Sequence, residues 1–113
     1  MATVELYAKH VKFGELKRAI EGVLADVDQG RYDEELRTAG VTRPADVKVA
    51  QGIRVEQKQY LTPEEWFQIT VIFGPLAAHI AKDVWDIIVV PKLKRLFRDD
   101  QIQTLPPKDD RKG

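Results

Sequence analysis

Residues 66–91, WFQITVIFGPLAAHIAKDVWDIIVVP, form the long apolar stretch on which the fold depends. Its uncharged part, residues 66–81, is shorter than the roughly 20 residues that a bilayer core requires. A longer span would include Lys82, Asp83 and Asp86, and each charge costs about 2.5–3.5 kcal/mol near the centre of an inserted helix. We therefore expect this stretch to belong to a folded domain rather than to a membrane span.

The stretch divides at Gly74-Pro75, because proline interrupts regular structure. From there the apolar residues recur at helical spacing until Pro91 interrupts the chain again. Residues 67–73 are rich in β-branched side chains, which favour a strand as much as a helix. The pattern predicts a long kinked helical segment and leaves residues 67–73 and 84–90 open between helix and strand.

Two elements are expected before this stretch in the first part of the chain. Residues 3–8 alternate apolar and polar side chains, which predicts a half-buried strand. Residues 13–27 carry apolar side chains at helical spacing, and Gly30 is placed to end that helix. Residues 31–41 predict a further short helix that Gly40 closes.

Two weaker patterns follow. Val47, Val49, Ile53 and Val55 alternate around Gln51-Gly52, which predicts a tight hairpin or, alternatively, one strand with a glycine bulge. The sequence LTPEEW, residues 61–66, contains a capping box with proline at the first helical position, so a helix should begin there.

The expected architecture is an α+β domain in the order β-α-(α)-β-β-α, with the long kinked apolar C-terminal helical segment packed on a short sheet. A chain of 113 residues with 43% apolar and 32% charged residues suits one soluble domain. We assign residues 1–98 to this domain. Residues 99–113 have no periodic pattern and are expected to form a mobile C-terminal tail.

Composition excludes several classes of function. Eighteen basic residues balance eighteen acidic ones, whereas nucleic-acid binders usually carry a basic excess, so a nucleic-acid partner is not expected. The chain has no cysteine, which excludes disulfides, thiol nucleophiles and cysteine-bound zinc. The first ten residues contain charges and no apolar run typical of a signal peptide, so the expected location is cytoplasmic.

No residue is assigned a catalytic, cofactor-binding or metal-binding role. His79 and Asp83 have the spacing of two ligands on one helical turn, but a metal site needs at least a third ligand. His10 has no nucleophile or carboxylate in a recognisable relation to it. The sequence has no phosphate-binding glycine loop or nucleophile elbow, so nothing in it favours an enzyme.

The apolar C-terminal segment, residues 76–97, offers the strongest functional hypothesis. A domain of this size is not expected to cover all of its large apolar side chains, and an uncovered apolar surface usually marks an interface. We predict a small non-catalytic interaction module, an adaptor or regulatory subunit, that binds a protein partner or forms a homo-oligomer. Trp85 is the expected anchor of that contact. The predicted contact residues are Leu76, Ile80, Val84, Trp85, Ile88, Leu96 and Phe97.

A basic cluster follows this segment and supports a second hypothesis. Lys92, Lys94, Arg95 and Arg98 lie close together, as cations often do at a helix C-terminus. The same charges suit an anionic lipid surface or an acidic partner, so the alternative is a peripheral membrane-associated protein. A small enzyme or ligand-binding protein comes third.

Overall fold

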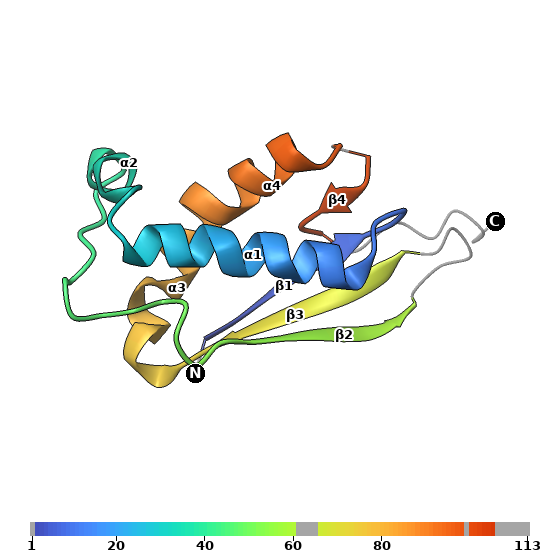
Figure 1. The fold of residues 1–113 in the computed structure, drawn as a ribbon, viewed down its shortest axis with the longest axis horizontal. Coiled ribbons are helices and arrows are strands. Elements are labelled where there is room, and N and C mark those ends of the chain that lie inside the picture. The colour runs from blue at the N-terminus through green and yellow to red at the C-terminus, as the bar shows by residue number, and fades with distance from the viewer. Residues whose placement is uncertain (1, 61–65, 99, 106–113) are drawn as a thin grey trace.

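A four-stranded antiparallel sheet and a layer of helices make up the structure, a computed structural model that describes residues 2–60, 66–98 and 100–105 (Figure 1). The order across the sheet is β2-β3-β1-β4. Helices and strands follow the predicted sequence of elements, with one additional strand at the end, so the α+β class is confirmed. The strands are β1 (Ala2–Ala8), β2 (Arg54–Tyr60), β3 (Phe67–Phe73) and β4 (Ile102–Gln103).

The helical layer has two parts, which lie side by side in Figure 1. The first is α1 (Phe13–Asp28), followed by the short α2 (Asp33–Thr38). The second runs without a break from Pro75 to Leu96 through a 3₁₀ turn, two α-helical segments and a π turn. These are η1 (Pro75–Ala77), α3 (Ala78–Val84), η2 (Trp85–Val89) and α4 (Val90–Leu96).

The π turn lies directly before Pro91, and this proline explains the turn. Proline has no N–H for the carbonyl four residues earlier, and its ring clashes with that carbonyl. Widening the helix by one residue relieves the clash, so the Val90 N–H bonds to the Trp85 carbonyl instead. The predicted long kinked C-terminal helix is thus confirmed, and residues 84–90 are helical.

The core lies between the sheet and the helices. On β1, Val4, Leu6 and Ala8 are buried, as their alternation predicts. The predicted apolar stripe of α1 is buried as well, and Gly30 has the positive φ of 84° expected after a helix end. The buried residues of α1 are Leu16, Ile20, Val23, Leu24 and Val27.

Residues 67–73 form a strand, which settles one of the two open alternatives. β3 pairs with β1 along its whole length, from Ala2 opposite Phe73 to Ala8 opposite Phe67. Its β-branched residues suit this central position, where one face packs on the helices. The helix start predicted at residues 61–66 lies outside the described residues up to residue 65, and Trp66 is not helical.

The hairpin predicted around Gln51-Gly52 is wrong, and so is the single bulged strand. Residues 47–50 are not a strand, and β2 pairs with β3 instead. The amides of Val49 and Ala50 donate to the Asp28 carboxylate at 2.6 and 2.9 Å, so this backbone has a side-chain partner in place of a ladder. Alternation at residues 47–49 reflects the burial of Val49 in the core rather than a strand.

The strand β4 extends the ordered structure beyond the predicted domain boundary at residue 98. Ile102 is buried, and β4 pairs with β1 through Tyr7–Gln103 and Ala8–Ile102. The Gln101 side chain also donates to the His10 carbonyl at 2.9 Å. Two paired residues produce no periodic pattern, so the sequence could not show this strand. Residues 106–113 of the predicted tail lie outside the described residues.

Candidate functional site

Most of the predicted contact residues are part of the core. Ile80, Val84, Trp85 and Ile88 are at most 5% exposed, because they face the sheet and α1. Phe97 is half-buried. The domain therefore covers most of the apolar surface that the sequence analysis assigned to a partner.

Two predicted contact residues are exposed, Leu76 at 80% and Leu96 at 55%. Leu76 lies in η1 and Leu96 at the end of α4, so they occupy opposite ends of the long helix (Figure 1). They do not form one patch. Most of the residues predicted to form the contact surface are thus not on the outside of the molecule.

The predicted basic cluster is on the surface, but one of its charges is already paired. Lys94, Arg95 and Arg98 are exposed, and Lys92 is half-buried. Arg98 forms an ion pair with Asp100 at 2.9 Å, and its hydrogen bond holds the pKa of that carboxyl below its usual value. This acidic neighbour reduces the local positive charge.

The structure gives the two histidines no shared site. His10 and His79 are both exposed, one before α1 and one in α3. Within the described ranges, no group of three or more His, Cys, Asp or Glu residues could hold a metal ion. No helix of the described residues is long and apolar enough to cross a bilayer.

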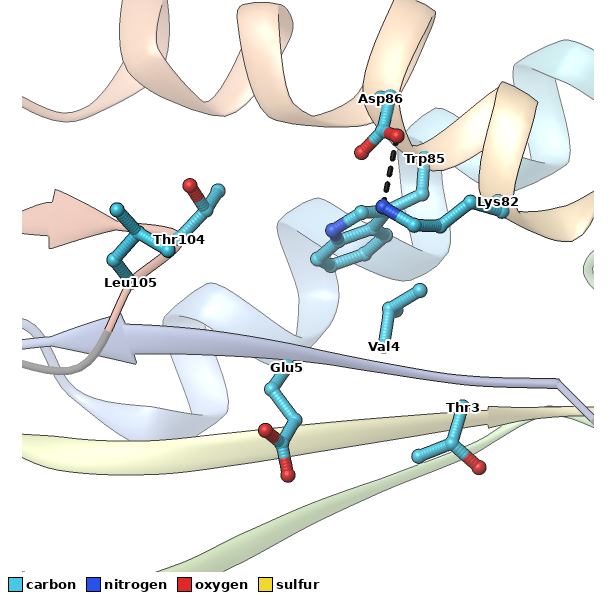
Figure 2. Close-up of a pocket in the computed structure, with 8 residues that line it drawn as sticks. All are labelled: Thr3, Val4, Glu5, Lys82, Trp85, Asp86, Thr104 and Leu105. Atoms are coloured by element: carbon cyan, nitrogen blue, oxygen red, sulfur yellow. Dashed lines mark hydrogen bonds and ion pairs between the residues drawn. The ribbon is translucent and has the colours of Figure 1, made fainter.

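A groove lies beside β1, and the sequence did not predict it (Figure 2). Its volume is about 520 Å³, which lies within the range of natural ligand sites. It exists because β4 covers only the end of β1, so no described residue pairs with Ala2–Leu6 on that side. Three segments line the groove: β1 with Thr3, Val4 and Glu5; the long helix with Lys82, Trp85 and Asp86; and the chain after β4 with Thr104 and Leu105.

The free edge of β1 presents backbone hydrogen-bonding groups to this groove. The Lys9 N–H donates to the Gln101 carbonyl at 2.9 Å, so Lys9 points its backbone groups toward β4. Successive residues of a strand point these groups to opposite sides, so Thr3 and Glu5 share this direction. Their N–H and C=O groups therefore face the groove, without a partner among the described residues.

The side chains of β1 divide the groove into two sides (Figure 2). Val4 points toward the helices, where the Trp85 indole lies over it, and both are almost fully buried. Thr3 and Glu5 point to the opposite face of the sheet. At the rim, Lys82 and Asp86 form an ion pair at 2.8 Å. The helix side thus has an apolar floor of Val4 and Trp85 beneath a charged rim, and the opposite face carries the polar side chains of Thr3 and Glu5.

Glu5 is the charged group on the polar side, and neutral donors hold its carboxylate. The Gln68 side-chain amide donates to Oε2 at 2.6 Å, and the Tyr7 hydroxyl donates to Oε1 at 3.3 Å. Burial raises the pKa of Tyr7, and the Glu5 charge raises it further, so this hydroxyl keeps its proton. No lysine or arginine in the described part of the chain forms an ion pair with Glu5.

Comparisons of the chain with models of protein families, with curated proteins and with solved structures gave no match. The groove combines backbone donors and acceptors, an apolar floor of Val4 and Trp85, and the charged residues Glu5, Lys82 and Asp86.

Proposed function

We propose that this chain is a small non-catalytic interaction module that binds an extended segment of a partner protein along the free edge of β1. The supporting observation is the row of N–H and C=O groups of Thr3 and Glu5 in the groove, which have no partner in the described part of the chain. A strand edge of this kind recruits an additional strand, with main-chain hydrogen bonds for affinity and side-chain contacts for specificity.

The opposite edge of the sheet, strand β2, has features that protect it from pairing, and the edge of β1 lacks them. β2 carries Arg54, Glu56 and Lys58, and its pairing with β3 is irregular between Gln57 and Tyr60. Charged side chains and bulges are the usual means by which a protein protects an edge from pairing. The free part of β1 has neither a bulge nor more than one charged residue, and it lies beside an apolar wall.

Backbone amide exchange tests the geometry before any partner is known. In the free protein we expect the amides of Val4 and Leu6, which face β3, to exchange slowly and those of Thr3 and Glu5 to exchange fast. A library of short random peptides is then selected on the wild type and counter-selected on Thr3→Pro. Proline at position 3 removes an outward N–H and leaves the β1–β3 hydrogen bonds in place. Thr3→Val is the matched control, because it keeps that N–H.

Supporting results are peptides that bind the wild type and Thr3→Val but not a folded Thr3→Pro, and that slow the exchange of the Thr3 and Glu5 amides. Peptides that protect other amides, or that bind all three proteins equally, contradict the proposal. A concentration-dependent dimer that protects the same amides would replace the partner with a second copy. The mass of the protein in solution should be measured by light scattering, because an elongated molecule of 50 × 24 × 24 Å elutes early from a size-exclusion column for its mass.

A second candidate function rests on the end of α4, where exposed Leu96 lies among exposed Lys94, Arg95 and Arg98. An apolar side chain among cations suits an anionic membrane surface. This hypothesis predicts binding to phosphatidylserine vesicles that weakens with salt and is absent for phosphatidylcholine vesicles. Both candidates assume the cytoplasmic location expected from the sequence.

A further inference from the structure

We propose that the groove selects a segment in which apolar and basic residues alternate, with the apolar residues facing Trp85 and a basic residue beside Glu5. This inference rests on the proposed function, since it names the chemistry of the partner that pairs with β1.

Strand geometry fixes which side chains of the segment meet which wall. Side chains of a paired strand alternate between the two faces of the sheet, in step with those of the strand beside it. The residue opposite Val4 therefore points toward the helices, and the residues opposite Thr3 and Glu5 point to the other face. A shift by one residue would exchange the two sets, so the pattern of the segment also sets its register.

The inner wall calls for an apolar side chain. Val4 and Trp85 form this wall at 6% and 2% exposure, and Leu105 stands beside it at 73% exposure (Figure 2). An aliphatic residue placed here would cover part of the Leu105 side chain and would leave no polar group without a partner. A charged residue at the same position would lose water and find only the rim ion pair of Lys82 and Asp86, whose charges are already matched.

The outer side calls for a cation. The Glu5 carboxylate has two neutral donors, Tyr7 and Gln68, and no described cation as a partner. These donors fix its direction. Opposite charges on neighbouring strands attract across the sheet, and like charges destabilise the pair. A lysine or arginine beside Glu5 is therefore favoured, and an acidic residue is rejected.

A second copy of the chain fits the same edge less well. Antiparallel self-pairing centred on Val4 would place Glu5 opposite Thr3 of the other copy. Both Glu5 carboxylates would then lie in the interface without a cation. The charge of the groove thus favours a basic partner segment over self-association.

The test uses two short synthetic peptides with blocked ends, one alternating valine with lysine and the other alternating valine with glutamate. Binding is measured by NMR titration at low and at high salt against the wild type, Glu5→Gln and Glu5→Lys. Glu5→Gln is the matched control, because it keeps the shape and the acceptor for Tyr7 but removes the charge. A lysine peptide with N-methyl groups on alternate amides shows whether binding uses the backbone, with the protein unchanged.

We expect the lysine peptide to bind the wild type up to about fivefold more tightly than the glutamate peptide, the ratio of a partly exposed ion pair. High salt and Glu5→Gln should remove this preference, and Glu5→Lys should reverse it. N-methyl groups can be placed on the odd-numbered or on the even-numbered amides of the peptide, and one of these two peptides should fail to bind. If both peptides bind equally and protect the Thr3 and Glu5 amides, the charge selection is refuted and the proposed function stands. If neither peptide protects these amides, the proposed function itself fails.

Discussion

Replacing Asp28 with alanine should destabilise the fold more than its partly exposed position suggests. Asp28 is the last residue of α1, where a carboxylate interacts unfavourably with the helix dipole. Alanine is also the better helix former, so α1 alone would favour the substitution. The carboxylate instead accepts the N–H groups of Val49 and Ala50, which it holds in place of a strand ladder.

The size of the effect follows from these two hydrogen bonds, at 2.6 and 2.9 Å. A hydrogen bond to a charged group contributes about 1.5–3 kcal/mol, and less where water can replace it. Val49 is fully buried, so its loop cannot move into water without exposing the core. After the gain in helix propensity is subtracted, we expect Asp28→Ala to lower the free energy of unfolding by about 2–3 kcal/mol.

Urea and thermal unfolding followed by circular dichroism measure this loss. An unfolding entropy of about 2.1 cal/mol/K per residue over 113 residues corresponds to roughly 4 °C in Tm for each kcal/mol, so Tm should fall by about 8–12 °C. The control is Asp26→Ala, which removes an exposed ion pair with Arg31 at 3.5 Å from the same helix turn. If the two variants differ by less than about 1 kcal/mol, the carboxylate does not hold the loop, and the reasoning is refuted.

Three further predictions concern single side chains. The Thr70 hydroxyl is buried and has no hydrogen-bond partner among the described residues. Thr70→Val should therefore raise the free energy of unfolding, measured with urea, by about 1 kcal/mol. A lower free energy of unfolding would show that the hydroxyl is bonded. Trp85→Ala should lower the free energy of unfolding by about 3–5 kcal/mol. Leu96→Ala, at an exposed site, should change it by less than about 1 kcal/mol. Similar losses for the two variants would mean that Trp85 is not a core residue. Arg43 donates to Asp33 at 3.0 Å and lowers the pKa of that carboxyl below 3.8. The pair therefore adds stability above pH 3.8 that is lost as the pH falls through the lower folded value, so the Tm difference between the wild type and Asp33→Asn should shrink toward low pH. A difference that stays constant down to about pH 2 would contradict this.

The parts of the fold that the sequence predicted are those whose pattern is local. The apolar spacing of α1, the break at Gly74-Pro75 and the interruption at Pro91 each follow from nearby residues. Alternation in β1 likewise predicted the burial of Val4, Leu6 and Ala8, whereas Tyr7, on the side of Thr3 and Glu5, is buried as well. These features depend on the period of one element and on backbone chemistry, so they do not require knowledge of the neighbours.

The errors arose where the partner is distant in the sequence. Val47 and Val49 alternate like a strand, but the backbone partner of Val49 is Asp28. The most apolar helical residues, such as Trp85, were assigned to an interface because the sequence does not show how much surface α1 and the sheet cover. Apolar content therefore predicted burial correctly but could not show whether the cover comes from the same chain.

The candidate site was invisible for a related reason. Glu5 and Thr3 looked like the polar side of an ordinary half-buried strand, and nothing in that pattern distinguishes an edge from a central position. Among the described residues, β1 has neighbours on both sides only at Tyr7 and Ala8, because β4 is two residues long. A signal could have come from the sequence after β4, where Pro106 and Pro107 follow Leu105.

Those two prolines bear on the proposed pairing of β1 with another chain. Continuing the β4 register would place Leu105 opposite Glu5 and the prolines opposite Val4 and Thr3. Proline has no N–H, so it cannot donate to the Thr3 carbonyl as an antiparallel ladder requires there. A partner segment with an N–H at every position would supply the donor to the Thr3 carbonyl that Pro107 lacks in this register.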